Sequence, residues 1–190
     1  MYLSSLRYNR GMHLNPYEKE NLIFIDTEFS DLDPYKGELL SVGIVTQAGK
    51  ELYIELKDIA ESSDWVKKHV LPQLNGPKFT KKQCIEQIRN FLGKTEPFAI
   101  AFVDNYDVIY LTKLFGAGKL PFKWLTIDFA SILFSQGINP VRFKRDASDA
   151  KQFYASLGID LKLYRPHHAL DDARLLRDVW LKITSQKNDL

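Results

Sequence analysis

Two acidic residues lie two positions apart in the apolar segment NLIFIDTEF, which spans residues 21–29. If this segment forms a strand, Asp26 and Glu28 project from the same face, because side chains alternate across a strand. Two carboxylates on one face of an apolar strand are costly unless a basic side chain or a metal ion compensates their charge. A strand end that reaches solvent explains the pair equally well, so this motif is a weak signal by itself.

A second acidic segment, DNYD, directly follows the apolar run 98–103. Asp104 occupies the expected N-cap position of a helix over 105–115, and both acids of the segment could simply stabilise the positive end of that helix. Asp107 also shares a helix face with the apolar residues three, four and seven positions later, so it is expected to point toward the core. Asp107 is therefore the candidate ligand, and Asp104 is not.

The same reasoning applies to the segment HHALDDARLL at residues 167–176. Asp172 lies on the apolar stripe of the helix expected here, whereas Asp171 falls on the side predicted to face solvent. A buried ion pair with an arginine is the simplest alternative explanation of an inward Asp172. His167 and His168 precede the helix, and each alone is explained most simply as a hydrogen-bonded loop histidine.

Four inward acids are thus expected on neighbouring elements of one sheet: Asp26, Glu28, Asp107 and Asp172. Clustered carboxylates repel one another, and without cations some of them must stay protonated. Their hard oxygen ligands suit Mg²⁺ or Mn²⁺. Two such ions, roughly 3.5–4 Å apart, can activate a water and stabilise the leaving oxygen in phosphodiester cleavage. A neighbouring histidine, with an ordinary pKa of about 6.5, can take the proton of the attacking water.

Three segments, FIDTEF, AFVDNYD and HHALDDARLL, resemble the three exonuclease motifs of the DEDDh superfamily, which has the ribonuclease H-like fold. The last motif of that family is His, any residue, Ala, two residues and Asp. His167 with Ala169 and Asp172 fits this spacing, whereas His168 and Asp171 do not. The resemblance covers most of the chain, from about Leu22 to about Leu181.

The resemblance implies a metal-dependent 3′-5′ exonuclease in which His167 is the general base. It also implies that two Mg²⁺ or Mn²⁺ ions are held by four acids, Asp26, Glu28, Asp107 and Asp172. The segments DTEF, SDWVKKHVLP and AFVDNYD, the last followed by Leu-Phe-Gly, are similar to a group of compact bacterial 3′-5′ exoribonucleases. That similarity implies single-stranded RNA as substrate and nucleoside 5′-monophosphates as products.

Val103 stands where many other superfamily members have Asn, four residues before Asp107, which argues against the proofreading and ribonuclease T-like branches.

Two alternatives stay open. One is a 3′-5′ exodeoxyribonuclease on the same scaffold, which differs in whether the 2′-hydroxyl is read. The other is a non-catalytic nucleic-acid-binding module, whose hallmark would be the loss of a ligand acid. Relatives in the superfamily are often homodimers, so a homodimer is expected here.

Substrate contacts are expected from aromatic and basic residues near the motifs. Phe29 and Trp65 could stack on bases, although a core phenylalanine and a helix anchor explain them as well. Arg142, Lys144 and Arg145 form a basic cluster that could meet phosphates, although a solvated charge run explains it equally well.

The elements that must position these residues follow from periodicity and turn signals. Strands are predicted at 21–29, 38–46, 51–56, 98–103 and 124–127, and helices at 63–70, 80–92, 105–115, 129–134, 147–157 and 170–183. Residues 137–145 are predicted to form a flexible loop. Antiparallel strands followed by alternating strands and helices indicate an α/β fold with a mixed sheet, parallel after its first three strands and flanked by helices.

The 190 residues, 45% of them hydrophobic and 26% charged, indicate one globular domain over 21–190 with an N-terminal extension at 1–20. Cys84 is the single cysteine, no secretory signal is visible, and the apolar runs are far shorter than the ~20 residues of a membrane helix. We therefore expect a cytoplasmic location without membrane association. The net charge of +2 neither demands nor excludes a nucleic-acid partner.

Overall fold

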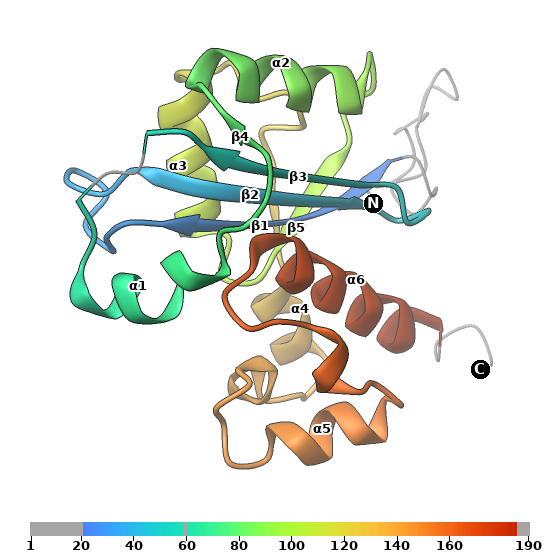
Figure 1. Ribbon diagram of the computed structural model, residues 1–190. Coiled ribbons are helices and arrows are strands. Elements are labelled where there is room, and N and C mark those ends of the chain that lie inside the picture. Colours follow the sequence, from blue (N-terminus) through green and yellow to red (C-terminus); the bar gives the residue numbers. More distant parts are fainter. Residues whose placement is uncertain (1–20, 59–60, 186–190) are drawn as a thin grey trace, which may run out of the picture.

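The computed structural model of the protein describes residues 21–58 and 61–185 (Figure 1). The N-terminal extension predicted for residues 1–20 lies outside the described residues, as do residues 186–190. Among the described residues, no helix is both long enough and apolar enough to cross a bilayer.

A six-stranded mixed sheet forms the centre of the fold, with the strand order β4-β3-β2-β1-β5-β6 (Figure 1). The strands are β1 (Leu22–Phe29), β2 (Leu39–Thr46), β3 (Glu51–Leu56), β4 (Lys78–Phe79), β5 (Phe98–Ala101) and β6 (Ile127–Asp128). β1, β2 and β3 pair antiparallel, whereas β4, β5 and β6 each pair parallel with a neighbour. The predicted α/β fold with a mixed sheet, antiparallel in its first three strands and parallel afterwards, is confirmed.

Helices cover both faces of this sheet. They are α1 (Asp64–His69), α2 (Lys81–Leu92), α3 (Asn105–Phe115), α4 (Phe129–Ser135), α5 (Ala150–Ser156) and α6 (Ala169–Ser185), with short 3₁₀ helices η1 (Leu71–Gln73), η2 (Pro140–Phe143) and η3 (Leu161–Leu163). α2 and α3 lie on one face, and α4, α5 and α6 lie on the other (Figure 1). Each face therefore has its own hydrophobic core.

The side chains of β1 alternate between these two cores. Ile23 and Ile25 are buried in the core that α2 and α3 cover, whereas Leu22 and Phe24 are buried in the core that α6 covers. Asp26 is the next residue in the second series, so its side chain turns toward α6. Along this one face of β1, apolar core residues are thus followed by the acids of the candidate site.

Local sequence signals place the helix ends as predicted. Thr80 and Gln83 make both hydrogen bonds of a capping box at the start of α2. Gly93 ends that helix with a φ of 64°, a left-handed conformation that glycine adopts without strain. The side chain of Ser63 likewise caps α1 by accepting a hydrogen bond from the Val66 N–H.

Two predicted strands have different bounds. The strand predicted at 98–103 ends at Ala101, because Val103 has a φ of 58°, which extended backbone excludes. The Val103 N–H donates to the Asp128 carboxylate at 3.0 Å. Asp128 also caps α4, so the strand predicted at 124–127 is shortened and shifted to β6.

Four short elements, β4, η1, η2 and η3, were not predicted, and one predicted helix is shorter. β4 has only two residues, too few to show a period-two pattern. η2 lies inside the predicted loop 137–145, where Asn139 caps a turn that begins with a proline. The helix predicted at 147–157 begins later, as α5.

Candidate active site

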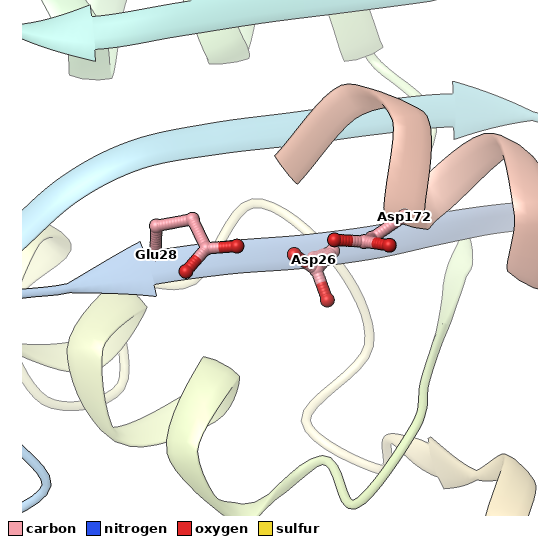
Figure 2. A group of neighbouring side chains, drawn as sticks. All are labelled: Asp26, Glu28 and Asp172. Atoms are coloured by element: carbon pink, nitrogen blue, oxygen red, sulfur yellow. The ribbon is translucent and has the colours of Figure 1, made fainter. Parts of the chain in front are cut away.

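Three carboxylates from two elements lie together beside β1. Asp26 and Glu28 project from β1, and Asp172 projects from the first turn of α6 (Figure 2). Each residue offers one oxygen, and these oxygens all lie within 4.8 Å of one another. The alternation of side chains along β1 and the inward position of Asp172 on α6 therefore bring the acids of the first and third motifs together.

Asp107 reaches the same site from the first turn of α3. Only 6% of it is exposed, and the Thr27 hydroxyl donates to its Oδ1 at 2.7 Å. Thr27 separates the two acids of β1 in the sequence, so this bond ties α3 to the acidic end of the strand. Asp104, which the helix-face reasoning does not require to point inward, accepts a hydrogen bond from Thr126.

A cavity of about 740 Å³ lies against these acids. All but one of the predicted site residues line this cavity. Those that do are Asp26, Glu28, Phe29, Trp65, Asp107, Lys144, Arg145, His167 and Asp172. The exception is Arg142, whose Nε donates to Asp149 at 2.6 Å in a half-exposed ion pair outside the cavity lining. The structure thus separates the predicted basic cluster into two residues at the cavity and one that is engaged elsewhere.

Burial and mutual repulsion raise the pKa values of these acids. Burial, followed by repulsion from Asp172 and Asp107, raises the pKa values of Asp26 and Glu28 well above their ordinary range. Burial likewise raises the pKa of Asp107 to about 7 and that of Asp172 to about 6. Carboxylates that share one buried site cannot all be ionised unless cations join them.

A single guanidinium partly compensates this charge. Arg145 pairs with Asp172, and within residues 21–58 and 61–185 no other ion pair to the four acids is found. One positive charge cannot neutralise four carboxylates. Three of the acids lie within 4.8 Å of one another and Asp107 lines the same cavity, and their hard oxygen ligands suit divalent ions such as Mg²⁺ or Mn²⁺.

His167 faces the cavity, on the backbone turn that precedes α6. Its φ of 57° is unusual for a residue other than glycine, and its ring lies edge-on to Trp65 with 4.9 Å between the ring centroids. Burial lowers the pKa of His167 below its ordinary value. The imidazole is therefore neutral at neutral pH and able to accept a proton.

His168 points away from the cavity into the protein. Only 1% of it is exposed, its ring packs on Tyr53 with 4.3 Å between centroids, and its Nε2 lies 2.9 Å from the Arg165 guanidinium. Of the two histidines, the one that fits the family spacing is thus the one at the cavity.

The prediction that Asp171 faces solvent is wrong. Asp171 is only 3% exposed, because Arg165 and Arg174 fold over it and donate hydrogen bonds at 2.7 and 2.6 Å. The spacing of apolar residues predicts which side chains of α6 face the core. It does not predict that arginines from the preceding loop and from the helix itself cover the opposite side.

An aromatic wall that sequence reasoning only partly identified borders the acids. Phe29 stacks on Tyr110 with 4.4 Å between ring centroids and on Tyr106 with 5.5 Å. Tyr106 lines the cavity and was missed, although its spacing of four from Tyr110 places both rings on one helix face. Trp65, 52% exposed, also lines the cavity and stacks on His69.

Comparison with known proteins adds sequence relatives. No family model matches the chain. Two proteins named 3′-5′ exoribonuclease, from the CDC 1551 / Oshkosh and H37Rv strains of Mycobacterium tuberculosis, are each 34% identical to it over 102 residues. The match covers 49% of this chain and 60% of each relative, so the chain spans less than two thirds of the curated relatives' length.

Comparison with solved structures identifies the fold. A full-length 3′-exonuclease superimposes with a TM-score of 0.63 at 14% identity, covering 87% of this chain and 82% of the other. The zinc-bound complex of Escherichia coli ExoI with single-stranded DNA superimposes with a TM-score of 0.64 at 11% identity, covering 87% of this chain and 40% of the other. The chain therefore has the fold of 3′-exonucleases and a sequence similar to bacterial 3′-5′ exoribonucleases, which confirms the predicted resemblance.

Proposed function

We propose that the protein is a metal-dependent 3′-5′ exonuclease that hydrolyses single-stranded RNA to nucleoside 5′-monophosphates. The observation that carries this proposal is the convergence of Asp26, Glu28 and Asp172 within 4.8 Å, in a cavity that His167 also lines. Neither a binding module nor a structural protein needs such a costly group of buried acids.

We assign the metal-binding role to Asp26, Glu28, Asp107 and Asp172, with two Mg²⁺ or Mn²⁺ ions as the expected occupants. When bound, such ions activate a water and stabilise the leaving oxygen of a phosphodiester. The protein residues supply the negative charge that retains the ions. Asp107 is held by Thr27, so its carboxylate is oriented before any ion arrives.

The general base of this proposal is His167. Its lowered pKa keeps the ring unprotonated near neutral pH, as an acceptor of the proton from the attacking water must be. The left-handed backbone at this position turns the ring toward the cavity, while the neighbouring His168 anchors the same turn in the interior.

Substrate binding is assigned to the other cavity residues. Phe29 and Tyr106 offer a stacked aromatic surface, and Trp65 offers a half-exposed indole; each can stack on a base without reading its identity. Lys144 and Arg145 lie at the same cavity and supply positive charge for phosphates.

The preference for RNA is supported by the names of the sequence relatives, whereas the structural neighbour ExoI was solved with single-stranded DNA. Matched RNA and DNA oligomers, labelled at the 5′ end and incubated with Mg²⁺ or Mn²⁺, distinguish the two substrates. We expect a ladder that shortens from the 3′ end, nucleoside 5′-monophosphates as products, and faster digestion of RNA.

Other outcomes of the same assay contradict specific parts of the proposal. Equal or faster digestion of DNA indicates an exodeoxyribonuclease. Tight oligomer binding without product over hours indicates a non-catalytic binding module. The expected homodimer is tested separately by light scattering coupled to size-exclusion chromatography, where a mass near 22.0 kDa contradicts it.

A further inference from the structure

Arg145 has two partners at the edge of the cavity. Its Nη2 donates to Oδ1 of Asp172, and its Nη1 donates to the backbone carbonyl of Tyr164 at 2.8 Å. The side chain is 20% exposed, so the guanidinium lies between the interior and the cavity. Arg145 is thus the basic residue in direct contact with the candidate metal ligands.

The contact with Asp172 conflicts with metal binding. Asp172 belongs to the group of three carboxylates whose oxygens lie within 4.8 Å of one another. A divalent ion and a guanidinium that approach the same carboxylate compete for its oxygens and repel each other. Filling the site with ions therefore weakens the bond between Arg145 and Asp172.

The second contact does not depend on Asp172. The Tyr164 hydroxyl donates to Asp178 at 2.6 Å, farther along α6, which fixes the segment that carries the Tyr164 carbonyl. Phe143, two residues before Arg145, stacks on Phe102 with 4.4 Å between ring centroids. If Arg145 released Asp172, these contacts would therefore keep it at the cavity.

We propose that Arg145 exchanges partners: it pairs with Asp172 while divalent ions are absent and binds a phosphate of the nucleic-acid strand once ions occupy the acids. The balance of charge supports this exchange. Two divalent ions match the four acids, which leaves the guanidinium with no carboxylate to pair with and a phosphate as the available anion. This inference rests on the proposed function for the identity of its phosphate ligand, but not for the competition with metal.

The simplest opposing explanation is a structural ion pair that only ties the loop to α6. The two explanations predict opposite effects on metal affinity. If Arg145 competes with the ions, removing its charge strengthens metal binding. If it only holds Asp172 in place, removing it weakens metal binding, because the ligand loses its orientation.

Calorimetric titration of Mn²⁺ into ion-free protein tests the exchange, with wild type, Arg145→Gln and Arg145→Lys. We expect Arg145→Gln to bind Mn²⁺ about 3- to 10-fold more tightly than wild type. Arg145→Lys keeps the positive charge, so we expect its Mn²⁺ affinity to stay within about twofold of wild type. Thermal unfolding of each variant shows that the fold is retained.

Arg142→Gln is the matched control. It removes the same charge from the same segment, but its partner is Asp149, outside the cavity lining. We expect its Mn²⁺ affinity to equal that of wild type. Unchanged or weaker Mn²⁺ binding by Arg145→Gln, or an equal gain in Arg142→Gln, overturns the exchange.

Steady-state kinetics of the same variants on an RNA oligomer separate this inference from the proposed function. With saturating Mn²⁺, we expect Arg145→Gln to raise the KM for an RNA oligomer about tenfold despite its tighter metal binding. An unchanged KM overturns the phosphate part of the exchange. If wild type degrades no strand although the Mn²⁺ titrations show competition, the proposed function fails and the metal part of the exchange stands.

Discussion

Gly43 lies directly across the sheet from Asp26, in the antiparallel pairing of β1 with β2. A Cβ atom added to Gly43 would lie 2.3 Å from the carbonyl carbon and oxygen of Ala169, at the start of α6. The first turn of α6 therefore rests directly on the strand backbone. This close approach places Asp172, three residues further along the helix, beside Asp26.

Gly43→Val is expected to push the first turn of α6 away from β2. We predict a loss of about 1–3 kcal/mol in the free energy of unfolding, because the contact becomes overpacked. We also predict at least a tenfold loss of kcat, because Asp172 moves relative to Asp26. Gly43→Ala, with a smaller added group, should give a smaller loss of both. Wild-type kcat in a folded Gly43→Val variant would show that the close approach does not position the acids.

The two adjacent histidines are expected to have separable effects. His167→Ala should lower kcat by about 10²–10⁴-fold, because the general base is lost. Its stability should change little, because the ring lines the cavity. His168→Ala should keep most of kcat but lose about 1–3 kcal/mol of stability, because Arg165 and Asp171 lose a buried partner. Steady-state kinetics and urea unfolding of both variants measure the two effects, and the reverse pattern would mean that His168 is the base.

The stability of the ion-free protein should depend on the protonation of the Asp107 carboxyl group. Its pKa is about 7 in the folded protein and about 4 in the unfolded chain, so between these values the folded state binds more protons. Asp107 therefore contributes a loss of stability as the pH rises from about 4 to about 7. His167 and His168 contribute in the opposite direction, because burial lowers their pKa values.

Comparison with Asp107→Asn cancels the histidines, which are common to both proteins, and also removes the repulsion from Asp107 that raises the pKa values of Asp26 and Glu28. Relative to wild type, the variant should gain stability as the pH rises over that window, by up to about 1.4 kcal/mol per pH unit from Asp107 itself and further from the relieved repulsion on Asp26 and Glu28. Urea unfolding in EDTA at several pH values measures the difference. A difference that does not vary with pH is the contrary result.

Two exposed tryptophans allow a matched test of base stacking. Trp65 lines the cavity, whereas Trp124 is 86% exposed and is not part of the cavity lining. Trp65→Ala should weaken binding of the RNA strand by about 1–3 kcal/mol, seen mainly as a higher KM. Trp124→Ala should leave KM unchanged. Equal effects of the two substitutions would exclude a specific stacking role for Trp65.

Much of the fold could be predicted because its local signals agree with its tertiary structure. The alternation of β1 and the caps of α2 depend on neighbours in the sequence, and both are as predicted. The same local reasoning placed Asp107 inward, where it is buried. It failed for the end of β5, where Val103 leaves the extended region to meet Asp128, which is distant in the sequence.

The parts of the site that could not be predicted are contacts between distant side chains. No periodicity indicates that Arg165 covers Asp171, or that Arg145 reaches Asp172 and the Tyr164 carbonyl. Such contacts depend on the paths of loops, which have no regular repeat. Residue types and spacing thus identified the acids, whereas their cationic partners required the structure.

The metal dependence of monophosphate release from single-stranded RNA tests the central claim most directly. Wild type and Asp172→Asn are freed of ions with EDTA, and nucleoside 5′-monophosphates are quantified as Mn²⁺ is added. We expect no release without ions, release that saturates with Mn²⁺ in wild type, and a rate more than about 100-fold lower in a folded Asp172→Asn variant. Release in EDTA, or an unchanged rate in Asp172→Asn, would contradict a nuclease that works through ions held by these acids.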